Sequence, residues 1–147
     1  MYPDRVSAPT LSLKHCPCGN LRPYAECCGR LHGGEPADSA VRLMRARYTA
    51  YVLRLPEYLL ATWHVSTRPT QLELPVEEGL RWQGLDVHAQ QQAGDSARVE
   101  FIARFRLGQG PVQQQHEVSR FLREQSRWFY LDGEFPVPKS AQIAKPK

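Results

Sequence analysis

At 147 residues the chain has about the length of one domain, and its 41% hydrophobic and 23% charged residues are ordinary for a folded protein, which excludes wholesale disorder. Its net charge of +4 allows an acidic partner, but no block of about five like charges occurs, so an unstructured nucleic-acid-binding arm is not expected. The sequence has no stretch of about 18 apolar residues and no secretory leader pattern, so we expect a cytoplasmic protein without a membrane-spanning helix.

Composition divides the chain into four segments. Residues 1–13 are polar and contain prolines, and we expect them to be loose. Residues 14–34 hold all the cysteines and end in glycines, and residues 35–133 carry regular hydrophobic patterns. Residues 134–147 contain three prolines, and we expect them to form a flexible tail.

Two helices are expected after the cysteine segment. Apolar residues recur at helical spacing over 39–54, where Asp38 or Ser39 can cap the helix start. Pro56 prevents continuation of this helix and suits the first position of a second one, which we expect over 57–63. Three arginines between the apolar positions are expected to form a solvated helix face: Arg42, Arg45 and Arg47.

Beyond residue 80 the hydrophobic period changes to two, which predicts strands. We expect them over 80–91, 97–107, 113–124 and 127–132, with turn residues between them. One face of the second strand is apolar and the other is mixed, as in a sheet covered on one side. Two helices followed by antiparallel strands predict an α+β fold in which a curved sheet wraps against the helices.

All four cysteines lie within thirteen residues: Cys16, Cys18, Cys27 and Cys28. Cytosolic thiols stay reduced, so this density favours one metal site, with a redox or disulfide role and unligated thiols as the alternatives. Four thiolates complete the tetrahedral coordination of Zn²⁺ and leave no open position, so we expect a structural zinc ion. Gly19 would let the chain turn after the first pair, and Tyr24 could pack over the site. His15 and His32 flank the cluster and could replace a cysteine, but we expect both to be exposed.

The cysteine segment resembles a known motif. Cys-Pro-Cys-Gly at 16–19, Tyr24, and Cys-Cys-Gly at 27–29 look like the SEC-C motif, the small zinc-binding segment at the C-terminus of the SecA translocation ATPase, where it contacts the chaperone SecB. Asn20-Leu21 stands where that motif usually has Ser-Gly, and Cys28 stands where SecA has a histidine.

The rest of the chain is similar to the bacterial YchJ-like family. The stretches that carry this likeness are 43–51, 61–69, 99–101, 116–121 and 128–133, so that with the cysteines it covers most of residues 14–133. The resemblance implies a cone-shaped fold like that of nuclear transport factor 2, with helices cupped in a curved sheet. It does not imply a function.

A cupped sheet often encloses a ligand pocket. Six polar residues are candidates for lining such a pocket: His64, Arg68, Glu100, Arg104, His116 and Glu117. If the two central strands pair, several of these side chains would lie near one another, and a histidine beside a carboxylate can act as general acid or base. The alternative is structural: Glu100, Arg104 and Arg120 would form cross-strand ion pairs on a solvated face, and His64 would make a capping or core hydrogen bond.

These features favour a non-catalytic protein-interaction module, in which the zinc segment presents a docking surface and the cupped domain adds a second site. The alternative is a small-ligand-binding or enzymatic domain that uses the cupped pocket, and catalysis is the less favoured of the two. Nucleic-acid binding rests on the positive charge alone and is not expected. An open sheet of this kind is also compatible with a homodimer.

Overall fold

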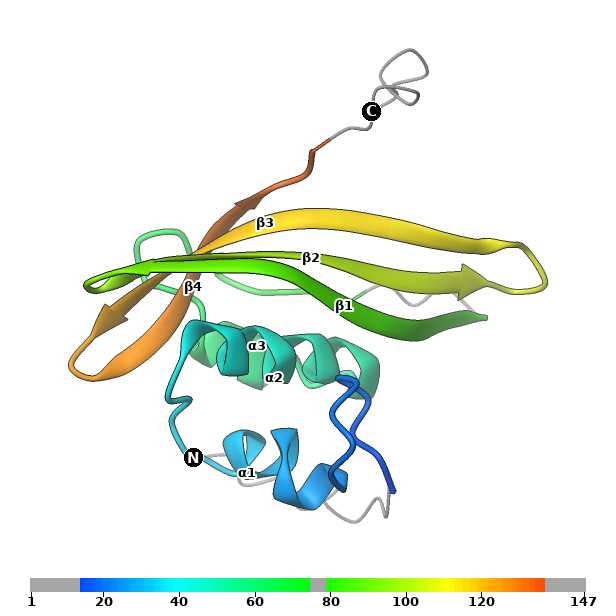
Figure 1. Cartoon of the computed structure of the whole chain (residues 1–147), viewed down its shortest axis with the longest axis horizontal. Helices are drawn as coiled ribbons and strands as arrows, with labels where there is room; N and C mark the ends of the chain where they lie inside the picture. The colour runs from blue at the N-terminus through cyan, green and yellow to red at the C-terminus, as the bar shows by residue number, and fades with distance from the viewer. Residues whose placement is uncertain (1–13, 75–78, 137–147) are drawn as a thin grey trace.

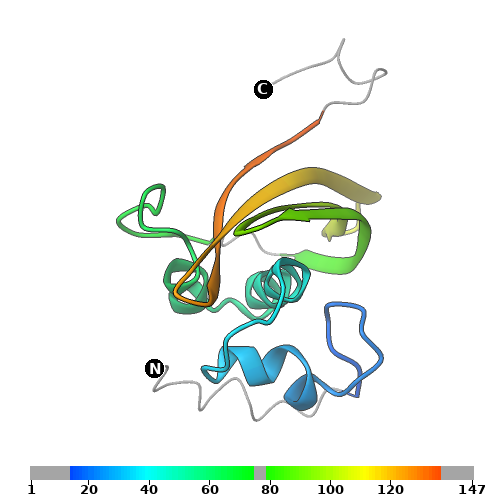
Figure 2. The same cartoon turned by 60° about the vertical axis from the view of Figure 1, so that its left-hand side comes forward.

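A computed structural model describes residues 14–74 and 79–136. A curved antiparallel sheet covers a pair of helices, and the cysteine segment packs on the side of these helices that is turned away from the sheet (Figures 1 and 2). This is the α+β architecture that the sequence predicts. The predicted loose segment 1–13 lies outside the described residues, as do residues 137–147 of the predicted tail.

The first long helix, α2 (Ala40–Leu53), agrees with the predicted helix to within one residue at each end. Ser39 caps it, because its hydroxyl accepts a hydrogen bond from the backbone N–H of Arg42 at 3.1 Å. Arg54 ends it in the left-handed conformation, with φ of 58°.

The second helix, α3 (Pro56–Ala61), starts at the predicted proline and stops before the predicted end at residue 63. The chain leaves the helix there because its backbone bonds to the sheet instead. Tyr130 N donates to Thr62 O at 2.8 Å, and His64 N donates to Tyr130 O at 2.7 Å. These two bonds anchor the end of α3 to the last strand.

Four strands form one sheet in chain order, each antiparallel to the next: β1 (Leu80–Ala93), β2 (Ser96–Leu107), β3 (Val112–Glu124) and β4 (Arg127–Glu134). Each lies within two residues of its predicted bounds. Gln125 and Ser126 have φ of 53° and 66°, as a two-residue hairpin between right-twisted strands requires.

Register shifts in β1 bend the sheet. The register of β1 with β2 shifts between Trp82 and Gly84 and again between Val87 and Ala89, and such bulges bend a strand. Figure 1 shows the sheet arched over α2 and α3. The concave side of the sheet therefore faces the helices.

The cysteine segment contains a 3₁₀ turn, η3 (Tyr24–Glu26), and a short helix, α1 (Cys28–His32), which packs on α2. Gly19 has φ of 97°, which confirms the expected turn after the first cysteine pair. Buried apolar residues of the segment, such as Leu31, belong to the same core cluster as the buried residues of α2 and β2.

The predicted solvated arginine face of α2 is wrong for two of its three residues. Arg47 is 5% exposed, and the guanidinium of the half-buried Arg45 donates to Cys18 O at 2.7 Å. The reason is that α2 has the sheet on one side and the cysteine segment on the other, so little of it can face water. Among the described residues, none of the helices has the length and hydrophobicity needed to cross a membrane.

Candidate functional site

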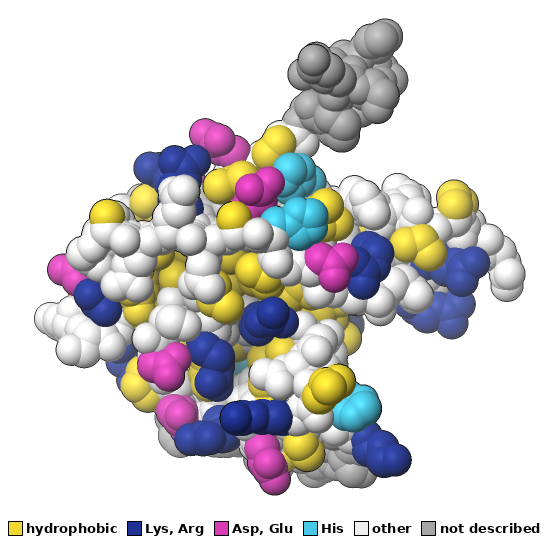
Figure 3. Space-filling model, in the orientation of Figure 1, with side chains coloured by type: hydrophobic (Ala, Val, Ile, Leu, Met, Phe, Trp, Pro, Cys, Tyr) yellow, Lys and Arg dark blue, Asp and Glu magenta, His cyan; other side chains and the backbone are white. Residues whose placement is uncertain are grey.

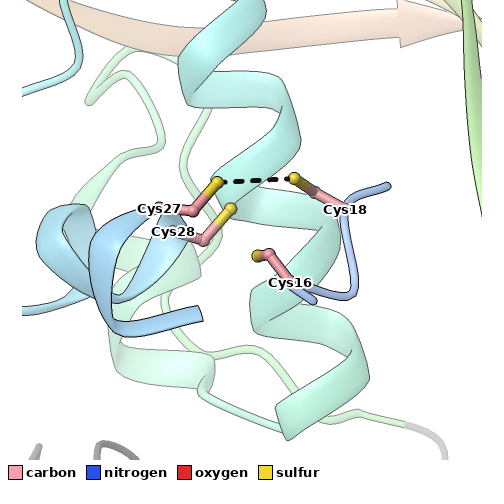
Figure 4. A group of neighbouring side chains, drawn as sticks. All are labelled: Cys16, Cys18, Cys27 and Cys28. Atoms are coloured by element: carbon pink, nitrogen blue, oxygen red, sulfur yellow. Dashed lines mark hydrogen bonds between the residues drawn. The ribbon is translucent and has the colours of Figure 1, made fainter. Parts of the chain in front are cut away.

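The four cysteine side chains point toward one another (Figure 4). Their sulfur atoms all lie within 4.8 Å of one another, and Cys18 Sγ is 3.7 Å from Cys27 Sγ. Tetrahedral Zn–S bonds of about 2.3 Å would hold sulfur atoms about 3.8 Å apart. The donor set of Cys16, Cys18, Cys27 and Cys28 therefore fits one four-coordinate metal ion.

The centre is closed to solvent. None of the four cysteines is more than 3% exposed, and all four are free thiols rather than disulfides. Four protein ligands leave no coordination position for water or substrate. The arrangement can hold the segment together, and it offers no place for chemistry at the metal.

The pKa values of the cysteine thiols show how a bound cation would change the charge of the cluster. Hydrogen bonds from Cys18 and Cys28 hold the pKa of Cys16 well below its usual range. The pKa of Cys28 lies well above its usual range, first because of its hydrogen bond to Cys16 and then because of burial, and burial raises the pKa of Cys27 to about 12. Without a metal the cluster keeps protons because four neighbouring thiolates repel, whereas a bound divalent cation ionises its thiol ligands.

Helix α2 contacts the cysteine cluster through Thr49. The Thr49 hydroxyl, fully buried, donates to Cys28 Sγ at 3.4 Å and lies 3.8 Å from Cys16 Sγ. Such outer hydrogen bonds orient ligands and tune their charge. The loop itself is closed by a backbone bond from Cys16 N to Arg22 O at 2.8 Å.

His32 is buried rather than exposed, and it is not a ligand. Its Nε2 donates to Ala46 O at 2.8 Å, so its Nδ1, 2.8 Å from the Tyr24 hydroxyl, accepts from that group. Burial lowers the pKa of His32, which keeps the ring neutral in this arrangement. Tyr24 and His32 thus fasten the cysteine segment to α2, while His15 is exposed as expected.

Gly29 follows the second cysteine pair at a point with no room for a side chain. A Cβ there would lie 2.7 Å from Tyr24 O and 3.1 Å from the Tyr24 ring. We expect Gly29→Ala to destabilise the protein by about 1–3 kcal/mol and to speed metal transfer to a chelator. The control is Gly33→Ala, whose Cβ would meet its nearest atom at 3.4 Å. Denaturant unfolding and chelator competition measure both effects, and equal behaviour of the two variants would contradict the steric argument.

A second feature is an open cavity of about 370 Å³ between α2 and the concave face of the sheet, which we call the cup. Its walls are largely aromatic, with Tyr48 and Tyr51 from α2 facing Trp82 of β1 at ring-centroid distances of 5.8 and 6.5 Å. Hydrophobic side chains are visible in Figure 3 between the strands above and the helices below. The volume suits a small organic molecule.

One basic and one acidic residue line the cup, Arg47 and Glu117. Arg47 was expected in solvent, but it stands three or four residues from Leu43, Met44 and Tyr51, on the apolar stripe of α2. That spacing is the signal that could have identified it. Glu117 is 8% exposed, and its Oε2 accepts hydrogen bonds from the Ser119 hydroxyl at 2.7 Å and the Tyr130 hydroxyl at 3.1 Å.

Burial raises the pKa of Glu117, which gives it a predictable effect on stability. A carboxyl with a raised pKa stabilises the folded state below its unfolded pKa, and this contribution is lost as pH rises through the folded pKa. We expect the unfolding free energy of wild type minus that of Glu117→Gln to fall as the pH rises above about 4.3, the unfolded pKa of glutamate, by at most about 1.4 kcal/mol per pH unit. Because both proteins lose metal in acid, that effect cancels in the difference. The exposed Glu73→Gln variant is the control, and a flat difference for Glu117→Gln would refute the assignment.

Of the six residues predicted for a pocket, Glu117 alone lines the cup. Glu100 and His116 do come together, with His116 Nε2 2.6 Å from Glu100 Oε2, but they lie on the convex face of the sheet. Arg104 pairs there with Asp86. The reason is strand alternation, since neighbouring residues of a strand face opposite sides and His116 cannot share a face with Glu117.

The convex face of the sheet therefore matches the structural alternative of cross-strand ion pairs. Arg120 donates to both carboxylate oxygens of Asp132, at 2.7 and 2.6 Å, and this pair is exposed on both sides. Pairs of this kind contribute little to stability in water. Arg68 is exposed in the segment between α3 and β1.

His64 forms a chain of hydrogen bonds away from the cup. Its Nδ1 lies 2.7 Å from the Ser66 hydroxyl, and its Nε2 lies 2.8 Å from a carboxylate oxygen of Glu124. The order serine, histidine, glutamate resembles a hydrolase triad, but the backbone N–H of Ser66 also donates to Nδ1 at 3.1 Å and occupies the lone pair that a general base needs. Glu124 is half-exposed, so this chain fixes the turn after α3 against the sheet.

Comparison with known proteins agrees with the architecture. A family model described as "YchJ, middle NTF2-like domain" matches residues 39–133. A UPF0225 protein of Methylibium petroleiphilum is 52% identical over 141 residues, covering 94% of this chain and 98% of that protein, and one of Xanthomonas campestris is 48% identical over 126 residues, covering 85% and 98%. The solution structure of a SEC-C motif containing protein from Rhodopseudomonas palustris superimposes with a TM-score of 0.73 at 37% identity, covering 82% of this chain and 97% of that one. Because the family model covers residues 39–133 and these relatives are about half identical over most of the chain, the chain belongs to the YchJ (UPF0225) family.

Proposed function

We propose that this protein is a non-catalytic binding module whose SEC-C segment folds around a structural Zn²⁺ ion and presents a docking surface to another protein. The observation that carries the proposal is the closed centre of four buried thiols, none of them more than 3% exposed. A closed centre stabilises a surface, and the segment is too short to hold its shape without such a crosslink.

Zinc is the proposed metal because of the donor set. Four thiolates at tetrahedral spacing suit Zn²⁺, which is not redox-active and is almost always bound by four tetrahedral ligands in structural sites. The R. palustris neighbour, described as a SEC-C motif containing protein, supports this choice.

The proposed docking surface is the tip of the cysteine loop. Leu21 is 77% exposed there, in a loop closed by the hydrogen bond from Cys16 N to Arg22 O. The exposed side chains of Lys14 and Arg22 lie in the same segment. An apolar residue with basic neighbours suits a protein partner that offers a small apolar pocket with an acidic rim.

Metal analysis tests the first part of the proposal. Purified protein is expected to contain one zinc per chain, with four thiols that react with a thiol reagent only after a chelator is added. Iron, or thiols that react freely in the untreated protein, would refute a structural zinc.

Affinity capture with zinc-loaded protein tests the second part. Leu21→Asp is expected to lose a captured partner that Val112→Asp retains, because Val112 is 48% exposed at the start of β3, away from the loop. Partners that bind both variants equally would refute docking at the loop while leaving the zinc assignment intact.

A further inference from the structure

The cup carries features that a docking module does not require. It is a cavity of about 370 Å³ that adjoins a buried guanidinium, a buried carboxyl and aromatic walls. An open cavity of this size with aromatic walls leaves apolar surface in contact with water, which is unfavourable. The composition of the walls indicates which molecule would fill it.

Arg47 is the first such feature. Its Nη1 donates to Leu59 O and to Thr62 Oγ1, both at 2.8 Å, and its guanidinium carbon lies 4.3 Å from the Tyr130 ring centroid and 5.1 Å from that of Trp63. Among residues 14–74 and 79–136, none of the ion pairs includes Arg47. Arginine stays charged, and a buried cation is costly unless an anion balances it.

Trp63 is the second feature. Its indole N–H is buried and has no hydrogen-bond acceptor, and it is the one side-chain nitrogen or oxygen in this condition within the described part of the chain. Trp63 also lines the cup, beside Arg47. Buried donors of this kind are rare because leaving one unpaired costs about 1–3 kcal/mol. An acceptor oxygen supplied from outside would satisfy it.

Glu117 completes the polar side of the cup. Both of its hydrogen bonds reach Oε2, so Oε1 is the oxygen that remains for a ligand. Burial raises the pKa of this carboxyl, so it keeps its proton to a higher pH than an exposed glutamate does. Among the polar groups at the cup, Arg47 keeps its positive charge and the Trp63 N–H is a donor without a partner in the described part of the chain.

We propose that the cup binds a small organic acid, with its carboxylate at Arg47 and a flat apolar body against the aromatic wall that Tyr48, Tyr51 and Trp82 form. A carboxylate supplies the negative charge that no ion pair among the described residues gives Arg47 and the acceptor oxygen that the Trp63 N–H lacks there. The three aromatic rings present faces and edges to a flat body, which they can bind without hydrogen bonds. The site is independent of the docking loop, because Leu21 and the cysteines do not line it.

The experiment uses the zinc-loaded full chain and two probes of the same shape, indole-3-acetate and its uncharged amide. Titration calorimetry gives both affinities, and tryptophan indole NH signals in NMR spectra report whether Trp63 and Trp82 are contacted. We expect the acid to bind at least about tenfold more tightly than the amide and to shift both signals. Equal affinity of the two probes, or binding that leaves both tryptophan signals unmoved, would overturn the proposal.

Substitutions then assign the preference to one residue. Arg47→Met is expected to bind the acid and the amide equally, whereas Arg47→Lys keeps the charge and a preference for the acid. Arg42→Met on the same helix, outside the cup, should behave as wild type. If Arg47→Met fails to fold, Arg47→Lys and the comparison of the two probes on wild type still decide the matter. An acid preference that survives in folded Arg47→Met would refute the role of Arg47.

Discussion

Cys28→Ser is expected to abolish stoichiometric metal binding and to release residues 14–34 from the body of the protein. Structural Zn²⁺ contributes about 10–16 kcal/mol of apparent binding free energy in small zinc-binding peptides, and it is folding free energy when the site forms only in the folded state. Without it, the segment retains one 3₁₀ turn and a five-residue helix, which are too short to persist alone.

Metal analysis and amide hydrogen exchange measure this outcome together. Exchange should become fast over residues 14–34 in the variant, while the sheet remains protected. Wild-type protein treated with a chelator should behave in the same way and recover when Zn²⁺ is returned, whereas Cys28→Ser should not recover. Retained protection in the metal-free segment would show that packing on α2 suffices and that the metal is dispensable for folding.

Phe121→Ala is expected to destabilise the protein by about 3–5 kcal/mol, because it removes a ring from the centre of the sheet. Phe121 is 1% exposed and packs against Tyr130 at a ring-centroid distance of 5.9 Å. Phe135, which lines the cup as Phe121 does, is a matched control of the same residue type. Phe135 is 54% exposed, so Phe135→Ala should change the unfolding free energy by less than about 0.5 kcal/mol.

Denaturant unfolding of the zinc-loaded variants compares these two costs. The midpoint should fall steeply for Phe121→Ala, with an unchanged dependence on denaturant, and should hardly move for Phe135→Ala. Similar losses of unfolding free energy in the two variants would contradict the assignment of Phe121 as buried and Phe135 as exposed.

The strands were predictable because alternation of apolar and polar residues is a local property. In β2 the odd-numbered positions 97 to 103 are buried, and the sequence shows this directly. The early end of α3 was not predictable, since Thr62 and Trp63 leave the helix for a partner in β4 that is distant in the sequence. Long-range pairing overrides local helix propensity there.

The cysteine cluster was also predictable, because four cysteines within thirteen residues can meet at one point. The residues that support the cysteine cluster were not predictable from the sequence. Thr49 belongs to α2, and its hydrogen bond to Cys28 depends on how α1 docks on that helix. For the same reason His32 was expected in solvent, although its contacts with Tyr24 and Ala46 place it in the core.

For the pocket, the sequence identified the right strands and mostly the wrong faces. The candidate set combined Glu117 with His116, although adjacent strand residues point to opposite sides. Arg47 was missed because arginine was assumed to be solvated, whereas its position among apolar residues of α2 placed it inward.

Helix α2 is shared by both halves of the molecule, and this limits how the protein can be divided. On one side of this helix, Ala46 and Thr49 form hydrogen bonds with the cysteine segment. On another side, Arg47 and Tyr48 line the cup. A fragment that starts at residue 39 would therefore carry a complete sheet but expose to water the apolar surface that Tyr24 and Leu31 normally cover. The change of composition near residue 34 separates two sequence motifs, but the hydrophobic core crosses it without a break.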